Sequence, residues 1–439
     1  MEFDYKKILI MGYGKSGQAV ESVLKKLDNV EYKIYDNGKK LTGGNYYAKL
    51  TKKLIRQFDL LIVSPGVSVY NKYIIYAERI GIKVIGELEF GYWFTDSPVI
   101  AITGTNGKTT TTRLANNIIG STFNSGAYGN IGEPLSVAYN KGHDYLVCEV
   151  SSFQLETTCM FKPYISVILN IAEDHIDRHK TFENYITAKL GLIKNCNEKS
   201  IAILNADDDI IMSRTENVKL KKYFISQYKK VKGVYIHKGK IMSSLSSKVE
   251  EIISLDEIEG LFGVMQDVLA GILIGLLLKI DKDKIVQEVK KFKVAPHRLE
   301  LVGKKDNVRY INDSKSTNVH SALHALGSVK ERVVLLLGGQ DKNLNFDKIF
   351  IDYKDNIDLI VAFGGARNKI LKCAKKNNFE SIKICKTFKE AVEMACASAK
   401  ENNVVLLSPA CASLDEFKNY EERGEVFSNI VKGYINAKS

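Results

Sequence analysis

The chain has 439 residues, which is more than one ordinary domain holds, so we expect two or three domains. Hydrophobic residues make up 45% of the chain and charged residues 26%, a balance that is typical of a globular protein with full cores and excludes a disordered or fibrous chain. The net charge of +12 suits nucleic acid or anionic small substrates, and the lack of a basic block with interleaved aromatic residues favours the small substrates.

The longest apolar run, residues 268–278, is shorter than the roughly 20 residues that cross a bilayer, and the N-terminus lacks a signal-peptide pattern. The seven cysteines are scattered and form no C-x-x-C pair, which indicates reduced thiols and no zinc cluster. We therefore expect a cytoplasmic protein that binds neither a membrane nor nucleic acid.

The first segment begins with an apolar strand at 7–11, followed by the pattern G-x-G-x-x-G at 12–17 and a helical pattern at 18–27. A second strand at 32–35 leads into Asp36, where dinucleotide-binding folds place the acidic residue that holds a ribose hydroxyl. Two more strands are expected at 60–63, ahead of Gly66, and at 83–85. These features predict a Rossmann-like domain that binds a diphosphate and a ribose. A tight turn without a ligand is the alternative.

The second segment opens with a β-branched strand at 99–103 and a glycine loop that ends in Lys108, Thr109 and Thr110. A helical pattern follows from Thr112. The glycines let the backbone approach phosphates, Lys108 can reach the β- and γ-phosphates, and the Thr109 hydroxyl can hold Mg2+. The spacing departs from G-x-x-x-x-G-K-[ST], because Ile102 occupies the place of the first glycine. An ordinary glycine-rich turn is the alternative.

Polar side chains follow several later strands of this segment. We expect strands at 145–150, 165–169 and 201–204. Glu149 lies at the end of the first, His175 shortly after the second, and Asn205 directly after the third. Lys189 lies on a helix between the last two strands. The carboxyl ends of parallel strands form the rim where open α/β sheets bind ligands. A hairpin at 234–241 and helices at 261–278 and 282–292 complete the segment.

A third segment starts near residue 295 and alternates helices with strands at 333–337, 359–363 and 404–407. The chain is therefore predicted to be an α/β protein of three domains. They are an N-terminal Rossmann-like domain (1–94), a central domain with a P-loop ATPase-like parallel sheet (95–294), and a C-terminal Rossmann-like domain (295–439).

Six short runs, in this order along the chain, resemble the Mur ligases of peptidoglycan synthesis. They are TGTNGKTT at 103–110, GNIG at 129–132, Glu149 with Ser151 and Ser152, DHxDR at 174–178, PHRxE at 296–300 and NDSKSTN at 312–318. The resemblance spans all three predicted domains. Within the family, the runs at 151–155 and 408–424 are similar to those of members that add D-glutamate to UDP-N-acetylmuramoyl-L-alanine.

The resemblance implies an ATP-dependent amide ligase of cytoplasmic peptidoglycan precursor synthesis. ATP would phosphorylate the carboxylate of UDP-N-acetylmuramoyl-L-alanine, and the amine of D-glutamate would displace phosphate from the acyl phosphate. Such phosphoryl transfer depends mostly on positioning and charge neutralisation. The resemblance also implies two Mg2+ ions, a carbamylated Lys189 that supplies an anionic ligand, and a monomeric enzyme.

The family pattern assigns roles to individual residues. Catalytic roles fall to Lys108, Asn130, His175, Lys189 and Lys315. ATP binding falls to Gly104, Thr105, Asn106, Gly107, Lys108, Thr109, Thr110, Gln266, Arg298 and Asp313. The UDP substrate is assigned to Lys15, Ser16, Asp36, Asn37, Gly66 and Asn130. D-Glutamate is assigned to Thr317, Lys342, Ser413, Leu414 and Tyr420, and the metal ions to Thr109, Glu149, His175 and Lys189.

One run departs from the family pattern. Where members carry His-Asn-x-x-Asn, residues 262–266 read FGVMQ, so Gln266 can substitute for one amide and Gly263 cannot.

Two other functions stay open. A related Mur ligase, or an enzyme like folylpolyglutamate synthase, would use another acceptor, although the glycine-rich domain ahead of the phosphate loop argues against the folate enzyme. A non-catalytic protein that binds nucleotides or nucleic acid would turn over no ATP with any such acceptor.

Overall fold

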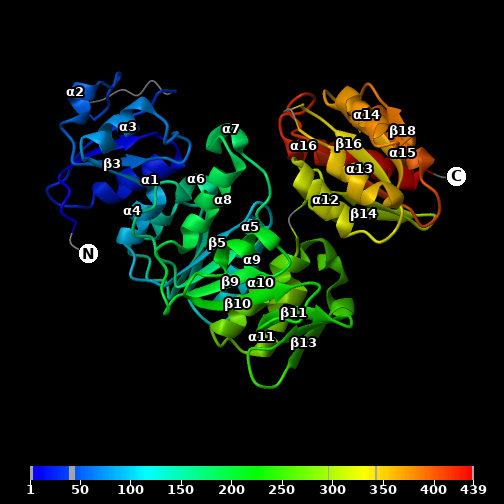
Figure 1. The fold of residues 1–439 in the computed structure, drawn as a ribbon, viewed down its shortest axis with the longest axis horizontal. Helices are drawn as coiled ribbons and strands as arrows, with labels where there is room; N and C mark the ends of the chain where they lie inside the picture. Colours follow the sequence, from blue (N-terminus) through cyan, green and yellow to red (C-terminus); the bar gives the residue numbers. More distant parts are fainter. Residues whose placement is uncertain (1–2, 39–44, 295, 342–343, 438–439) are drawn as a thin grey trace. The chain divides into compact units, whose positions relative to one another are not determined.

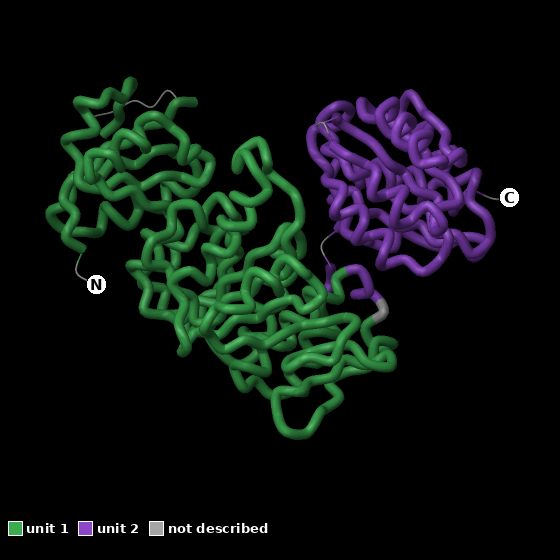
Figure 2. The backbone as a smooth tube through the Cα atoms, viewed as in Figure 1, with its two compact units in different colours: residues 1–259, 264–292 green, residues 260–263, 293–439 purple. Residues whose placement is uncertain are grey.

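The computed structural model describes residues 3–38, 45–294, 296–341 and 344–437 (Figure 1). The chain divides into two compact units, coloured separately in Figure 2. Unit 1 comprises residues 1–259 and 264–292, and unit 2 comprises residues 260–263 and 293–439. Unit 1 contains two sheets and unit 2 contains one, and all three are mostly parallel, as the alternation of strands and helices predicts.

The first sheet of unit 1 has four parallel strands in the order β2-β1-β3-β4. The strands are β1 (Lys7–Met11), β2 (Glu31–Tyr35), β3 (Leu60–Val63) and β4 (Lys83–Gly86). The helices are α1 (Lys15–Leu24), α2 (Lys52–Ile55), α3 (Lys72–Arg79) and α4 (Glu87–Trp93). The predicted bounds of β1 and β3 are confirmed, but α1 begins three residues before the predicted start at residue 18.

The second sheet of unit 1 has nine strands in the order β13-β12-β11-β10-β9-β8-β5-β7-β6. The central strands are β5 (Val99–Thr103), β6 (Ser125–Gly129), β7 (Tyr145–Glu149), β8 (Ile165–Ile168) and β9 (Ile201–Asn205). The others are β10 (Lys221–Ser226), β11 (Gly233–His237), β12 (Lys240–Ser243) and β13 (Glu250–Ser254). The predicted hairpin is confirmed, because β11 and β12 pair antiparallel across Lys238 and Gly239.

The helices of this part of the chain lie between these strands or follow the last of them in sequence. They are α5 (Lys108–Gly120), η1 (Leu135–Ala138), α6 (Ser152–Leu155), α7 (Ile176–His179), α8 (Phe182–Leu190), η2 (Gly191–Ile193), α9 (Asp209–Thr215), η3 (Leu255–Val264), α10 (Met265–Leu277) and α11 (Lys282–Lys291). The strands β5 and β8 are buried along their whole length, because helices cover both faces of a parallel sheet.

Helix α10 is apolar almost all round and packs directly on α5. A Cβ atom at Gly271 would lie 3.0 Å from Leu114, and one at Gly275 would lie 2.7 Å from Ile118, so these glycines let the two helices come close. The predicted single helix at 261–278 is wrong. Val264 has a non-helical φ of −131°, and a 3-10 segment ends there before α10 begins. The stretch 260–277 has the length and hydropathy of a membrane helix, but 78% of it is buried, as in the core helix of a soluble protein.

Helix α4 joins the first sheet to the second sheet. The Glu89 carboxylate accepts hydrogen bonds from the backbone N–H groups of Cys159, Met160 and Phe161 over 2.8–3.0 Å, and from Trp93 Nε1 over 2.7 Å. Its side chain is completely buried. These four N–H donors, together with the Cys159 thiol at 3.2 Å, replace the water that the buried carboxylate has lost, so the two parts meet in a specific polar contact.

Unit 2 contains one sheet in the order β14-β15-β19-β16-β17-β18. Its strands are β14 (Glu300–Lys305), β15 (Val308–Asn312), β16 (Val333–Gly338), β17 (Ile357–Phe363), β18 (Ile382–Ile384) and β19 (Val404–Ala410). Its helices are α12 (Val319–Gly327), α13 (Asp347–Tyr353), η4 (Lys354–Asn356), α14 (Arg367–Lys376), α15 (Phe388–Ser398) and α16 (Tyr420–Asn436). The strands β16 and β19 are fully buried, and β14 pairs antiparallel at the edge.

Candidate active site

The phosphate loop connects β5 to α5. Gly107 has a φ of +85°, and a Cβ atom there would lie 2.2 Å from Asp267 Oδ1, so this position requires glycine. Helix α5 begins at Lys108, four residues before the predicted start at Thr112, because the turn at Gly107 allows the helix to start at once. The first-turn N–H groups and the helix dipole therefore face the loop, as an anion site requires.

Side chains of the loop and of the neighbouring strand fill this turn. Lys108 Nζ donates to the carbonyl oxygens of Gly104 and Thr105 over 2.8 and 2.9 Å. Asn170, just beyond the end of β8, accepts from Asn106 N–H over 2.8 Å and donates to Asn106 O over 3.2 Å. These hydrogen bonds hold the Lys108 ammonium at the loop, where it can neutralise the charge of a phosphate.

Gln266 lies behind this loop. Its amide donates to the Leu169 carbonyl oxygen and accepts from Asn170 Nδ2 over 3.3 Å. The structure therefore uses the Gln266 side chain to support the Asn170 side of the loop, and its role toward a nucleotide stays a prediction.

Thr109, Glu149 and Asn130 form a compact polar group at the ends of neighbouring elements. Thr109 Oγ1 donates to Glu149 Oε2 over 2.8 Å, and Asn130 Nδ2 donates to Glu149 Oε1 over 2.7 Å. Glu149 is 1% exposed. The pairing of β7 with both β5 and β6 brings these three residues together. A threonine hydroxyl beside a carboxylate is a donor pair that suits Mg2+.

Lys189 is a buried lysine on α8. Its Nζ donates to the Gly104 carbonyl oxygen over 2.7 Å and lies 4.7 Å from the centre of the Tyr185 ring. Burial lowers the pKa of the Lys189 ammonium well below its ordinary value, and nearby Lys108 lowers it further, whereas Asp174 and Glu149 act in the opposite direction. Its amine is therefore far more readily neutral than that of a surface lysine.

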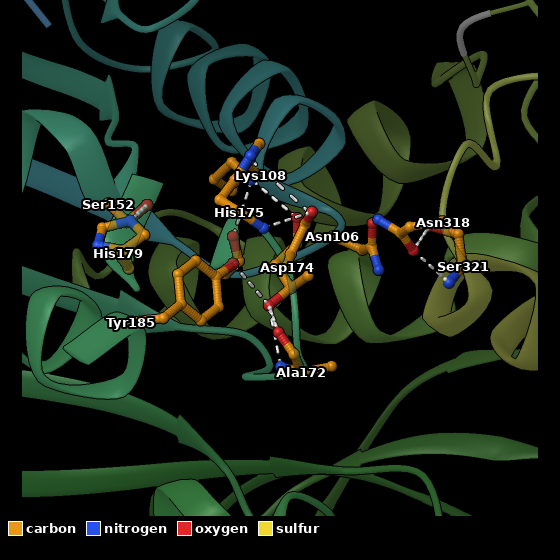
Figure 3. A network of polar contacts seen from close by, with 12 residues as sticks. Asn106, Lys108, Ser152, Ala172, Asp174, His175, His179, Tyr185, Asn318 and Ser321 are labelled. Carbon is orange, nitrogen blue, oxygen red and sulfur yellow. Dashed lines mark hydrogen bonds and ion pairs between the residues drawn. The ribbon is translucent and has the colours of Figure 1, made fainter. Parts of the chain in front are cut away.

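His175 has a left-handed backbone conformation, with a φ of +54°, and caps the short helix α7. Its side chain is 51% exposed, and Nε2 lies 3.8 Å from Asp174 Oδ2. Close by, His179 is buried, and its Nε2 lies 3.0 Å from Ser152 Oγ (Figure 3). The Tyr185 hydroxyl forms a hydrogen bond with Thr105 Oγ1 over 3.0 Å and so ties α8 to the phosphate loop.

The glycine loop of the first sheet opens on a cavity of about 490 Å³. Five residues predicted for the UDP substrate line it, namely Lys15, Ser16, Asp36, Asn37 and Gly66. The Asp36 carboxylate accepts from Tyr13 N–H over 2.7 Å and from Gly38 N–H over 2.8 Å. The cavity lies at the carboxyl ends of the first-sheet strands, where ligands bind in folds of this type.

The predicted ATP residues of unit 2 include a buried carboxyl group. Asp313 is 3% exposed and accepts from Ser316 Oγ over 2.5 Å and from Ser408 Oγ over 2.8 Å. Burial raises its pKa to about 6, against the lowering effects of these hydroxyls and of Arg298. Arg298 Nε is buried and has no hydrogen-bond partner among the described residues.

The residues predicted for D-glutamate differ in exposure. Thr317 and Leu414 are exposed, Ser413 is buried, and Tyr420 begins α16 with its ring 5.7 Å from Lys315 Nζ. Burial raises the pKa of the Tyr420 phenol to about 12. The prediction for Lys342 lies outside the described residues.

Two supporting residues were given no role of their own in the site predicted from the sequence. Asn170 braces the phosphate loop, and its position after a buried strand next to β5 was the available signal. Arg423 is completely buried and donates to Ser314 Oγ, Ser314 O and Cys411 O over 2.8–3.0 Å. It therefore fixes two loops that contain residues predicted to bind the substrates. Arg423 belongs to the run at 408–424 that resembles the family, but the sequence does not show that its side chain is buried.

The side chains that the structure describes do not by themselves form a complete metal centre. Among the described residues, no group of three His, Cys, Asp or Glu side chains is placed to hold a metal ion. The structure places Thr109 and Glu149 against each other, His175 against Asp174, and Lys189 against Gly104.

Comparison with known proteins gives matches along almost the whole chain. Residues 102–262 match the Mur ligase middle domain, and residues 297–411 match the Mur ligase, glutamate ligase domain. A protein of Pelotomaculum thermopropionicum named UDP-N-acetylmuramoylalanine--D-glutamate ligase is 39% identical, with 98% of each chain covered. One of the same name from Clostridioides difficile is 35% identical, with 98% of this chain and 99% of the relative covered.

Solved structures share the fold at lower identity. A pseudomurein peptide ligase type C from Methanothermus fervidus superposes with a TM-score of 0.62 at 20% identity, covering 98% of this chain and 100% of the other. A MurF ligase from Thermotoga maritima, solved in complex with ADP, gives a TM-score of 0.61 at 14% identity, covering 98% and 96%.

Proposed function

The chain belongs to the Mur ligase family, and from that premise we propose that it adds D-glutamate to UDP-N-acetylmuramoyl-L-alanine at the expense of ATP. The proposed reaction belongs to the synthesis of peptidoglycan precursors. Relatives with this named activity are 35–39% identical over nearly the full chain. The structural observation that carries the proposal is the placement of Thr109, Glu149 and Asn130 beside the phosphate loop, within the same unit as the open nucleotide-sized cavity.

The proposed chemistry has two steps. The substrate carboxylate attacks the γ-phosphorus of ATP, the bond to the β-γ bridging oxygen breaks, and ADP leaves. The amine of D-glutamate then attacks the carbonyl carbon of the acyl phosphate, loses a proton, and releases inorganic phosphate as the amide forms. Lys108 and the amides of the phosphate loop neutralise the charge that develops on the transferred phosphoryl group.

We assign the UDP end of the substrate to the first-sheet cavity and its carboxylate to Asn130 and His175. In unit 2 we assign Arg298, Asp313 and Lys315 to ATP, and Thr317, Lys342, Ser413, Leu414 and Tyr420 to D-glutamate. The domain limits at residues 94 and 294 remain part of this proposal. So do a monomeric state, a cytoplasmic location, and the lack of binding to membranes or nucleic acid.

Two Mg2+ ions are also proposed. Thr109 and Glu149 would hold the first, because their oxygens already lie 2.8 Å apart. His175 and Lys189 would serve the second, and when bound the ions neutralise phosphate charge. An amine is a poor ligand for Mg2+, so Lys189 fits this role as a carbamate. Its buried amine would add to carbon dioxide, forming an N–C bond and releasing a proton, and the lowered pKa supports that reaction.

The test is an acceptor screen with the purified full chain. Phosphate release is measured with ATP, Mg2+ and UDP-N-acetylmuramoyl-L-alanine, in the presence of D-glutamate, L-glutamate, L-lysine or diaminopimelate. We expect release with D-glutamate alone. Release with L-lysine and not with D-glutamate would instead assign the chain to a different acceptor, and no release with any of them would indicate a non-catalytic protein.

A further inference from the structure

The side chain of Arg178 joins two parts of unit 1 that each carry predicted substrate contacts. Its Nη2 donates to the Val67 carbonyl oxygen over 3.0 Å. Its Nη2 and Nε also donate to Glu156 Oε2, over 2.7 and 3.2 Å. The Arg178 and Glu156 side chains are 11% and 10% exposed, so water competes little for these hydrogen bonds.

The Val67 end of this bridge belongs to the wall of the first-sheet cavity. Val67 and the adjacent Gly66 both line that cavity. Val67 N–H donates to Ser64 O over 2.9 Å, and Ser64 Oγ donates to Gly12 O over 2.8 Å. The carbonyl that Arg178 holds is therefore tied to the glycine loop itself.

The other end of the bridge belongs to the surroundings of His175. Arg178 N–H donates to His175 O over 3.1 Å, and the guanidinium lies 4.8 Å from the centre of the Phe153 ring. Phe153 in turn contacts the His175 ring at a centroid distance of 4.9 Å. Glu156 also pairs with His179 Nδ1 over 3.2 Å. One side chain thus contacts the cavity wall and the neighbours of the proposed carboxylate site.

We propose that Arg178 is a positioning residue that fixes the span between the first-sheet cavity and the carboxylate site at His175. This inference rests on the proposed function, because the substrate must hold its UDP end in the cavity while its carboxylate meets ATP. A misplacement of about 1 Å between the anchored end and the reacting end costs up to about 100-fold in rate. Binding of UDP alone does not depend on this distance, because UDP occupies only the cavity.

The experiment compares Arg178→Lys with the wild type. Lysine keeps the positive charge for Glu156 but lacks the forked guanidinium that reaches Val67 O at the same time. The measurements are kcat and KM for UDP-N-acetylmuramoyl-L-alanine, the Kd of UDP by calorimetry, and the melting temperature. We expect kcat to fall about 10- to 100-fold while the Kd of UDP stays unchanged, and the melting temperature should fall only slightly through the loss of the buried hydrogen bond to Val67 O.

Two further variants make the result specific. Arg214→Lys alters another Arg–Glu pair, with Glu183 at 2.7 Å, whose side chains are about half exposed, and it should leave all values unchanged. Glu156→Gln keeps an acceptor for Arg178 and should lower kcat in the same direction by a smaller factor, which gives a second test if Arg178→Lys folds poorly.

Unchanged kcat in Arg178→Lys, or a loss of UDP affinity parallel to the loss of kcat in both variants, would overturn the positioning role. A wild-type protein that releases no phosphate with D-glutamate would refute the proposed function and this role with it. An active wild type beside an equally active Arg178→Lys would refute the positioning role alone.

Discussion

The two glycine loops of unit 1 follow the same plan and end in different geometries. Each follows a buried parallel strand, precedes a helix, and contains a glycine with positive φ, +89° at Gly12 and +85° at Gly107. The first loop opens on a cavity of about 490 Å³. The second is occupied by its own lysine, because Lys108 Nζ bonds the carbonyl oxygens of Gly104 and Thr105.

This difference indicates that the two glycine loops have different functions, one in binding the substrate and the other in catalysis. The open loop can accept the body of a ligand, so its residues should govern affinity. The filled loop concentrates positive charge beside Glu149 and Thr109, so its residues should govern rate. Variants in the two loops should therefore affect KM and kcat differently.

The largest effect is expected for Lys108→Met. Loss of the ammonium removes the charge that stabilises the transferred phosphoryl group, so kcat/KM for ATP should fall about 1,000-fold. Steady-state phosphate release measures this loss. The affinity for UDP, measured by calorimetry, should not change, and an equal loss of UDP affinity would argue against separate tasks for the two loops.

Lys189→Ala should lower kcat by about 100-fold, because it removes the proposed anionic ligand of the second Mg2+. Added formate or acetate should restore part of the activity, since a small carboxylate can enter the vacated space. Lys194→Ala removes a neighbouring lysine that bonds Thr158 O, and it should need no such rescue. Full activity of Lys189→Ala without added carboxylate would refute the carbamate.

Asp36→Asn should raise the KM for UDP-N-acetylmuramoyl-L-alanine about 10-fold and leave kcat nearly unchanged. The amide can keep only one of the two acceptor oxygens that now bind Tyr13 N–H and Gly38 N–H, and it removes the charge. Initial rates at varied substrate concentration give both constants. A fall in kcat of similar size would show that the open loop also governs rate.

The smallest effect concerns Glu87, at the start of the helix that connects the two sheets. Its Oε1 accepts from Ser136 N–H and Oγ over 2.7 and 2.6 Å, whereas Oε2 has no partner among the described residues. Burial raises the pKa of Glu87. The unfolded chain therefore loses this proton first, and the folded state loses stability as pH rises above the ordinary glutamate range.

Glu87→Gln should remove this dependence while keeping the contact to Ser136. Urea unfolding at pH 4 and pH 8 should show a variant similar to the wild type at the lower pH and more stable at the higher pH. Each unit by which burial raises the pKa corresponds to about 1.4 kcal/mol at most. A variant less stable than the wild type at pH 8 would indicate that the charged form is favoured inside the protein.

Sequence patterns predicted the fold class and the strands with dense β-branched residues, such as β1 and β3. Strand β6 was missed because its sequence, SGAYG, contains two glycines and no β-branched residue. Strand β14 was missed because it is a half-exposed edge strand with polar residues on both faces. Neighbours in the sheet define such strands, and these neighbours are distant in sequence.

The candidate site shows the same limit. The glycines, Lys108 and Glu149 stand in recognisable runs, so the sequence predicted their importance. Lys189 contacts Gly104, Asn170 contacts Asn106, and Arg178 contacts Val67, and the partners in these contacts are 64 to 111 positions apart in the sequence. Periodicity and spacing carry no information on such contacts.

The buried contact of Glu89 has a consequence for anyone who wishes to express or exchange the first domain. A fragment that ends at the predicted limit, residue 94, would keep the Glu89 carboxylate but lose the three backbone donors of Cys159, Met160 and Phe161. It would also expose the side chain of Leu88, which is now completely buried. A chimera that takes this domain from a relative must therefore also take the relative's segment that corresponds to residues 157–161. The exchangeable unit thus consists of two separate segments of the sequence.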